Sequence, residues 1–256
     1  MRYTIKLSFD GSKLSGWQKQ ANADSVQGEL SKALSLLCGA AIEVTGAGRT
    51  DAGVNAVNYI AHFDAPEPVE DAELLCYKLN AILPKQMAVH AVFPAADDFH
   101  SRFSAVSRQY RYFVHRPKDP FIEKFSYRCR RALDVKAMNE AASLLLGEHD
   151  FSCFEKTGSD NATSVCTVFE ARWDQYLPGH VSLMGYPCHE GDYLVFTIRA
   201  NRFLRNMVRA VVGTLLEIGL GKKEPSWVGE LLAGGTRSDA GQSVPGNALF
   251  LSDVEY

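Results

Sequence analysis

The chain has 256 residues, of which 46% are hydrophobic, and its formal net charge at pH 7 is −3. This composition supports one large or two ordinary buried cores, and it excludes binding to nucleic acid through bulk charge alone. No apolar run approaches the roughly 20 residues of a membrane helix, and the alternating segment Met1–Lys6 does not form a signal h-region. We therefore expect a soluble, cytoplasmic protein without membrane contact.

The six cysteines are widely scattered and include no C-x-x-C pair. In a chain of this length without a secretory signal, this pattern predicts free, mostly buried thiols. Cys188 and His189 are adjacent but have no companion pair at zinc spacing, so no metal site is expected.

The first 100 residues alternate strand and helix patterns. Residues 3–9 alternate apolar and polar side chains, as a half-buried strand does, and Asp24 or Ser25 can cap a helix that ends at Gly39. The other expected elements are strands over 41–45 and 55–63, a helix over 69–81 and a strand over 87–93. This order is that of a ferredoxin-like α+β unit, with helices on one face of the sheet.

The second part of the chain repeats this mixture loosely. A strand over 107–116 places Tyr110 and Arg111 on opposite faces. The further expected elements are helices over 134–146, 202–218 and 226–232 and strands over 165–176, 192–200 and 248–254. We expect two α+β domains, residues 1–103 and 104–256, with antiparallel sheets that form a central cleft.

Positive charge is concentrated in the middle of the chain. Nine Lys or Arg and two acids lie between Phe99 and Arg131, whereas residues 64–73 contain five acids and no base. In the helix expected over 202–218, the side chains of Arg202, Arg205 and Arg209 share one face without acidic partners at i±4. Such a face is either solvated or binds phosphate or a buried carboxylate.

The segment Gly46–Val54, with the sequence GAGRTDAGV, joins two expected strands. Its glycines favour a shaped turn that other backbone segments can approach closely. Asp51 is either an ordinary turn residue or a carboxylate that reaches a ligand, with Arg49 able to orient a phosphate. The spacings of the common phosphate-binding loops are absent.

Gly46–Val54 resembles the G-x-[GS]-R-T-D-x-G-V signature of the TruA family of tRNA pseudouridine synthases. Four further segments resemble other motifs of that family, and they occur along the chain in the order that the family has them. They are Phe9–Gln20 with Ser25–Gln27, Arg108–Tyr112, Gly147–Ser152 and Phe203–Arg209. Together they cover most of the chain. One departure is Ala248, which stands where the family usually has Gly in its P-x-x-G-L-x-L ending.

The resemblance implies the pseudouridine synthase fold, with two ferredoxin-like or RRM-like halves. It implies an isomerase that converts uridine to pseudouridine at positions 38, 39 and 40 of the tRNA anticodon stem-loop, without metal or organic cofactor. It also implies a homodimer that binds tRNA.

The resemblance assigns roles to individual residues as well. Asp51 would be the essential carboxylate, which attacks C6 of the base or C1′ of the ribose. Tyr110 would lie against the target base, and Arg209 would pair with the carboxylate. Arg49 would contact the RNA backbone or fill the space of the flipped base. Arg205 and Arg202 are expected to bind substrate because of the arginine face described above, and not because of the resemblance.

Two other functions stay open. A catalytically silent RNA-binding module would use the same basic surface, with Asp51 as a turn residue only. A retaining glycoside hydrolase would need a second carboxylate about 5 Å from Asp51, and no nearby acid suggests one.

Overall fold

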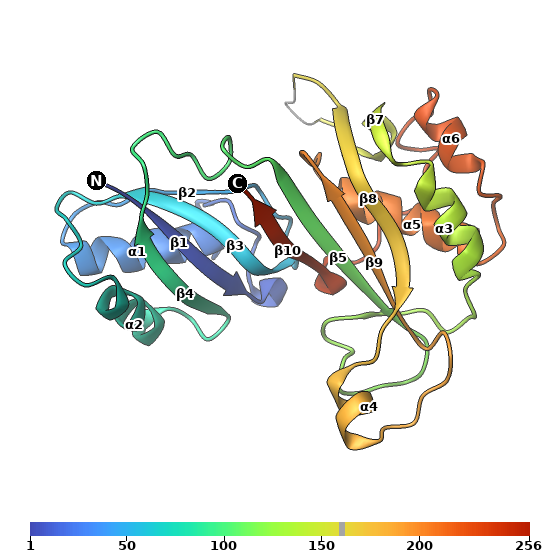
Figure 1. Ribbon diagram of the computed structural model, residues 1–256, viewed down its shortest axis with the longest axis horizontal. Helices are drawn as coiled ribbons and strands as arrows, with labels where there is room; N and C mark the ends of the chain where they lie inside the picture. The colour runs from blue at the N-terminus through green and yellow to red at the C-terminus, as the bar shows by residue number, and fades with distance from the viewer. Residues whose placement is uncertain (159–161) are drawn as a thin grey trace. The chain divides into compact units, whose positions relative to one another are not determined.

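The computed structural model describes residues 1–158 and 162–256. The chain divides into two compact units (Figure 1): Met1–Ser107 with Phe250–Tyr256, and Arg108–Leu249. We call them the first and the second unit. In the part of the chain that the structure describes, no helix has the length and apolar character needed to cross a bilayer.

The first unit is a β-sheet with two helices, α1 and α2, on one face (Figure 1). Its elements are β1 (Arg2–Phe9), a 3-10 turn η1 (Gly11–Lys13), α1 (Val26–Cys38), β2 (Val44–Gly46), β3 (Asn55–Asp64), α2 (Ala72–Ile82), β4 (Met87–Pro94) and β10 (Leu249–Glu255). β1 pairs antiparallel with both β4 and β3, and β2 pairs antiparallel with β3. This arrangement of β1 to β4 is the ferredoxin-like one that the order of elements predicts.

Local sequence accounts for these elements. Ile5 and Leu7 of β1 are fully buried, and Leu30 and Leu34 of α1 are as well. The Ser25 hydroxyl accepts from the Gly28 N–H at the start of α1, and Gly39 adopts φ 65° at its end. A polar N-cap and a left-handed glycine are the usual ends of a helix. α2 begins at Ala72 behind the Asp71 cap, three residues later than expected.

The second edge of β3 is shared by two strands. β2 pairs with its C-terminal part, from Gly46 opposite Ala61 to Val44 opposite Phe63. β10 runs parallel to its N-terminal part, with Phe250 opposite Asn55. The last strand of the chain therefore belongs to the first unit and supports the beginning of β3.

The second unit contains an antiparallel sheet in the order β5-β9-β8-β7. Its elements are β5 (Ser107–His115), β6 (Tyr127–Arg128), α3 (Val135–Ser143), β7 (Gly147–Asp150), η2 (Ser152–Phe154), β8 (Val165–Gln175), α4 (Gly179–Met184), β9 (Tyr193–Ala200), α5 (Met207–Gly219), α6 (Trp227–Leu232) and η3 (Gly246–Ala248). The short β6 pairs parallel with β5. α3, α5 and α6 lie together beside the sheet (Figure 1). The fold is therefore α+β with mostly antiparallel strands, as expected.

One prediction in this unit is wrong. The helix expected over 202–218 begins only at Met207, because Asn206 adopts the left-handed conformation with φ 65° and interrupts it. Arg202 and Arg205 therefore lie in the preceding turn, and the face of three arginines does not form. β6, β7 and α4 are short and were not predicted from the sequence.

All six cysteines are free, as expected, but only Cys153 and Cys166 are buried. Burial raises the pKa of both thiols to about 11, with smaller effects of neighbouring groups. Ala248 is buried in η3 and does not have a positive φ, so the Ala is accommodated without backbone strain. The domain division at residues 103 and 104 stays a prediction, because a domain is defined by folding on its own and not by compactness alone.

Candidate active site

Asp51 lies in the connection between β2 and β3, residues 47–54, which we call the Asp51 loop. The Val54 N–H donates to the Asp51 carbonyl at 3.1 Å, and Gly53 closes this turn with φ 81°. Asp51 is partly exposed and Arg49 is exposed. The loop therefore presents a carboxylate at the surface of the first unit, next to the strand pair that fixes both of its ends.

The segment after β1 holds the Asp51 loop by close backbone approach. The Trp17 N–H donates to the Thr50 carbonyl at 3.3 Å. An added Cβ at Gly16 would overlap with that carbonyl oxygen, and one at Gly11 would overlap with the Val54 carbonyl oxygen. Only glycine permits these approaches, which explains two of the glycines in the first motif.

Two stacked aromatic side chains, Trp17 and Tyr59, pack against the Asp51 loop. The rings of Trp17 and Tyr59 stack at 4.3 Å between centroids, and both side chains are buried. The Tyr59 hydroxyl donates to the Gly48 carbonyl and accepts from the Gly48 N–H at 3.3 Å. A Cβ at Gly46 would meet both aromatic side chains. The loop thus rests on rigid rings, which limits the movement of the Asp51 backbone.

A chain of side-chain amides extends from the loop to α1. Arg49 Nε donates to Gln18 Oε1 at 3.1 Å, and Gln18 Nε2 donates to Gln27 Oε1 at 3.1 Å. Gln27 Nε2 in turn donates to the Val44 carbonyl at 2.8 Å. Gln18 and Gln27 both lie in the first motif, but the sequence alone gives them no role. Their role follows from contacts between segments far apart in sequence, which spacing alone does not reveal.

One polar atom of the loop has no protein partner. The Thr50 hydroxyl is buried and forms no hydrogen bond among the described residues. A buried hydroxyl without a partner is unfavourable by about 1–3 kcal/mol. This donor and acceptor, directly beside Asp51, is therefore available to a bound molecule or a water.

Tyr110 lies on β5 in the second unit, opposite Ile198 of β9. It is 8% exposed, whereas Arg111 is exposed, so the two side chains lie on opposite faces as predicted. The Phe203 ring meets the Tyr110 ring edge-on at 5.0 Å. Tyr110 is thus an aromatic held in place by packing.

The turn before α5 and the segment Val244–Asn247 position the arginines of the second unit. Arg209 Nε donates to the Val244 carbonyl at 2.7 Å, and the Val244 N–H donates to the Arg209 carbonyl at 3.2 Å. Arg205 is exposed, with its carbonyl bonded to the Lys156 N–H at 3.0 Å, and Arg202 is half-buried. Arg209 is therefore the arginine with the most defined geometry.

The predicted site residues thus form two sets. Asp51 and Arg49 share one loop of the first unit, and the Arg49 side chain lies against Gln18. Tyr110, Arg202, Arg205 and Arg209 belong to the second unit. Within each unit the structure brings together motif segments that are far apart in the chain.

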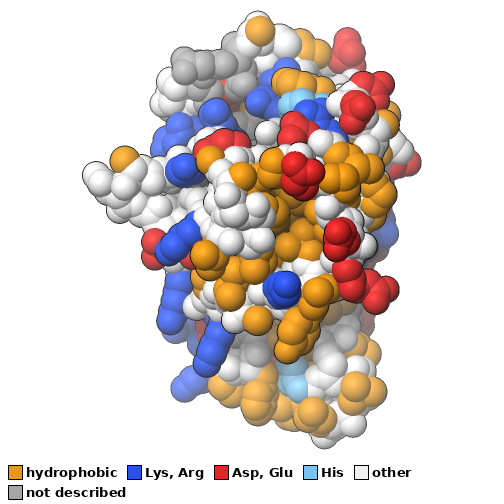
Figure 2. Space-filling view, turned by 90° about the vertical axis from the view of Figure 1, so that its left-hand side faces the viewer, with side chains coloured by type: hydrophobic (Ala, Val, Ile, Leu, Met, Phe, Trp, Pro, Cys, Tyr) orange, Lys and Arg blue, Asp and Glu red, His pale blue; other side chains and the backbone are white. Residues whose placement is uncertain are grey.

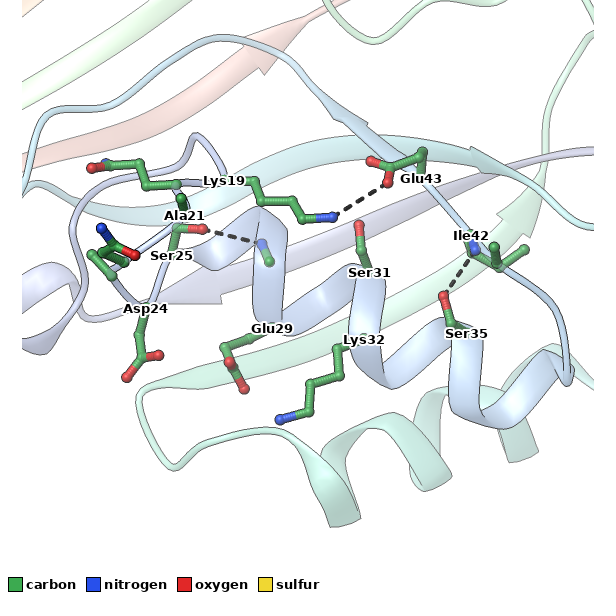
Figure 3. A pocket seen from close by; sticks show the side chains of 15 residues that line it. Lys19, Ala21, Asp24, Ser25, Glu29, Ser31, Lys32, Ser35, Ile42 and Glu43 are labelled. Atoms are coloured by element: carbon green, nitrogen blue, oxygen red, sulfur yellow. Dashed lines mark hydrogen bonds and ion pairs between the residues drawn. The ribbon is translucent and has the colours of Figure 1, made fainter.

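A groove of about 650 Å³ lies elsewhere, beside the N-terminal half of α1 (Figure 3). The Lys19–Glu43 ion pair, at 3.5 Å, borders the groove. Lys32, Asp24 and Glu29 also line the groove, so the groove contains both positive and negative side chains. None of the predicted site residues lines this groove, and we assign it no chemistry.

Surface charge varies over the molecule. Seen from the left-hand side of Figure 1, acidic and hydrophobic side chains lie together over the middle of the face, and Lys and Arg side chains gather along one edge (Figure 2). In residues 1–158 and 162–256, no three His, Cys, Asp or Glu side chains group as metal ligands do.

Comparison with known proteins identifies the family. The family model described as "tRNA pseudouridine synthase" matches residues 141–256. The tRNA pseudouridine synthase A of Parabacteroides distasonis is 45% identical over 255 residues, which are 100% of this chain and 96% of that protein. The enzymes of the same name from Bacteroides thetaiotaomicron and Bacteroides fragilis are 46% and 43% identical over 100% of this chain and 90% and 96% of their own lengths. The chain therefore belongs to the tRNA pseudouridine synthase A (TruA) family of isomerases.

Proposed function

We propose that this protein converts uridine to pseudouridine in tRNA, at positions 38, 39 and 40 of the anticodon stem-loop. Full-length similarity to three tRNA pseudouridine synthase A proteins supports the reaction class. The observation that carries the residue assignment is the Asp51 loop, in which a carboxylate is presented on a backbone fixed by glycines and by the Trp17–Tyr59 stack. A fixed nucleophile suits a reaction in which the base must detach and reattach in one site.

The reaction breaks the N1–C1′ bond and forms a C5–C1′ bond, so no atom is gained or lost overall. An Asp51 oxygen attacks either C6 of the base or C1′ of the ribose, and this bond breaks again later. The C5 proton leaves to a base, and N1 takes up a proton. The target nucleotide must leave its stack to reach the carboxylate.

The remaining residues position the substrate in this proposal. Tyr110 stacks on the extruded base, an interaction typically worth about 1–3 kcal/mol. The family resemblance gives Arg209 the role of pairing with the catalytic carboxylate, and its guanidinium is held by a hydrogen bond to the Val244 carbonyl. Arg49 contacts the RNA backbone or fills the space of the flipped base, and Arg205 and Arg202 bind phosphates.

We also propose that the protein acts as a cytoplasmic homodimer. Each subunit would contain two α+β domains, residues 1–103 and 104–256. The six free thiols suit a reducing compartment. Leu183 and Met184 of α4 are 84% and 81% exposed, and association is one way to cover such side chains. Sedimentation at micromolar concentration tests the dimer, and a monomer there would refute it.

The decisive experiment follows tritium release from tRNA transcripts labelled at C5 of uridine, with purified protein and no added cofactor. We expect release by the unmodified protein and none by Asp51→Asn, which removes the charged nucleophile but retains the shape of the side chain. Asp98→Asn, at an exposed carboxylate of the same unit, is the control and should keep full activity. Equal release by Asp51→Asn would refute Asp51 as the nucleophile. Binding of tRNA without release by the unmodified protein would support the silent binding module.

A further inference from the structure

The connection between β5 and α3, residues 116–134, carries an excess of positive charge that the proposed chemistry does not use. We call it the basic loop. It contains six Lys or Arg, namely Arg116, Lys118, Lys124, Arg128, Arg130 and Arg131, against three acids, Asp119, Glu123 and Asp134.

The three acids of the loop neutralise few of its cations. Two of them bind groups outside the set of cations, and the third lies near one arginine. The Asp119 carboxylate is fully buried and accepts from His180 at 2.7 Å and from the Tyr193 hydroxyl at 2.9 Å. Asp134 caps α3 by accepting from the Ala137 N–H at 3.0 Å. Glu123 lies 4.0 Å from Arg128, which therefore has a carboxylate nearby.

Among the cations, Arg116 pairs with Asp192 at 2.9 Å. Lys118, Arg130 and Arg131 are exposed, and no ion pair holds them among the described residues. Their charge is therefore uncompensated at the surface, which favours a polyanionic partner.

The basic loop is held in a defined shape. Besides the bonds of Asp119, the buried Ser126 hydroxyl lies 2.9 Å from His115 Nδ1, and the Cys129 N–H donates to the His115 carbonyl at 2.8 Å. β6, inside the loop, pairs with β5. A solvated surface segment does not require buried polar anchors of this kind, whereas a binding surface gains affinity from being ordered before the ligand arrives.

Aromatic side chains lie between the exposed cations. Phe121 is 68% exposed and Phe125 is 37% exposed. Lys124 Nζ lies 4.9 Å from the centre of the Phe125 ring. Cations interspersed with exposed aromatic rings are typical of surfaces that bind nucleic-acid backbones and unstacked bases.

The basic loop also adjoins the proposed substrate-binding residues of the same unit. Asn247 Nδ2 donates to the Lys124 carbonyl at 3.0 Å, and the Tyr112 hydroxyl donates to the Pro245 carbonyl at 3.1 Å. Val244, in the same segment, holds Arg209. The segment Val244–Asn247 therefore links the basic loop to Arg209 and to the face of β5 on which Tyr110 lies.

We propose that the basic loop binds the sugar-phosphate backbone of the tRNA. This inference rests on the proposed function and adds a substrate-binding surface to it. The loop contributes to tRNA affinity and not to the chemical step, because none of its exposed cations belongs to the proposed catalytic set.

The test replaces Lys118, Arg130 and Arg131 together by Glu in the full-length protein. We expect tRNA affinity to fall by at least about 10-fold and the slope of log K against log salt to decrease by about 2–3, because three phosphate contacts are lost. The KM for tRNA should rise, and kcat at saturating tRNA should stay unchanged.

Two matched variants control for folding and for net charge. Lys118→Arg with Arg130→Lys and Arg131→Lys keeps the charge and should keep the affinity. Replacement of Lys32, Lys78 and Lys85 by Glu changes net charge equally at exposed positions of the first unit and should leave the salt slope unchanged. Thermal unfolding of each variant shows whether it is folded.

The outcomes separate this proposal from the proposed function. Tritium release by the unmodified protein, together with an unchanged Kd and salt slope in the triple Glu variant, would overturn the proposal and leave the function intact. No tritium release by the unmodified protein would overturn the function, while the affinity measurement would still decide the role of the loop. A changed sedimentation coefficient with unchanged tRNA affinity would make the loop a protein contact and overturn the proposal.

Discussion

The Asp51 loop and the basic loop are both well defined, but different interactions hold them. The Asp51 loop is fixed by backbone approach at Gly11 and Gly16 and by the Trp17–Tyr59 stack. The basic loop is fixed by hydrogen bonds of a buried carboxylate, Asp119, and of buried hydroxyl and imidazole groups. The first kind of support depends on shape, and the second depends on protonation.

This difference predicts which perturbation affects which loop. Added volume should damage the Asp51 loop, since backbone in close contact cannot give way. Acid should loosen the basic loop, since protonation changes the bonds that Asp119 accepts. The four predictions below test this contrast from the largest expected effect to the smallest.

Gly16→Ala should have the largest effect. The new Cβ would overlap with the Thr50 carbonyl oxygen, and Gly16 has φ 88°, which L-residues avoid. Overpacking costs about 1–3 kcal/mol and the left-handed conformation about 1–2 kcal/mol, so we expect a loss of about 3–4 kcal/mol in the free energy of unfolding. Urea unfolding measures it, and Gly48→Ala is the control because an added Cβ there meets nothing within 4 Å. Equal losses in both variants would show that packing at Gly16 is not what fixes the loop.

His62 of β3, which lies opposite Thr45 of β2, should make the first unit sensitive to acid. Burial, aided by the charges of Arg2 and His100, lowers the pKa of His62 from 6.5 to about 4. The unfolded chain takes up this proton first, so stability is complete above pH 6.5 and falls by about 3 kcal/mol as the pH drops to about 4.

Urea unfolding between pH 7.5 and 4 measures this dependence. In His62→Gln the contribution should disappear, whereas His90→Gln, at an exposed position, should keep it. A slope that persists in His62→Gln would assign the acid sensitivity of the first unit to another group.

Asp119→Asn should loosen the basic loop by about 1–3 kcal/mol, the usual value for lost hydrogen bonds to a buried charged group. Burial alone would raise the pKa of Asp119, but the Phe121 N–H, the Tyr193 hydroxyl and His180 together lower it. The stabilisation is therefore present above the unfolded pKa near 4 and is lost as the pH falls through the lower folded value.

Hydrogen exchange of residues 116–134 at pH 6 measures this loosening directly. We expect faster exchange there in Asp119→Asn and no change in the Asp51 loop. Faster exchange in both loops would contradict their separate support.

Lys19→Ala should have the smallest effect. The Lys19–Glu43 pair spans 3.5 Å, and its side chains are 57% and 75% exposed. Exposed pairs contribute about 0–1 kcal/mol, so the free energy of unfolding and the rate of tritium release should change little. A larger loss in thermal unfolding would indicate that the groove beside α1 supports the Asp51 loop.

Much of the first unit could be predicted from sequence, because alternation in β1 and the caps of α1 are strong local signals. The glycines of the Asp51 loop predicted close backbone approach, but the partners, Gly11 and Gly16 with their facing carbonyls, depend on tertiary contacts. The start of α5 was predicted too early, because Asn206 fits the sequence pattern of a helix as an ordinary polar residue. Its left-handed backbone conformation, which the sequence does not reveal, prevents the helix from extending before Met207. The anchors of the basic loop were not predictable, since His180 and Tyr193 lie far from Asp119 in the chain.

The parallel pairing of β10 with β3 has a consequence for biosynthesis. Asn55 and Ala56, which follow the Asp51 loop directly, find their neighbours Phe250 and Leu251 only after residues 108–249 have been made. At about 5–20 residues per second, the ribosome leaves this edge of the sheet unpaired for roughly 10–30 s. The nascent chain thus cannot complete the pairing of β3, which directly follows the Asp51 loop, until translation reaches β10, and a truncated product would lack that support.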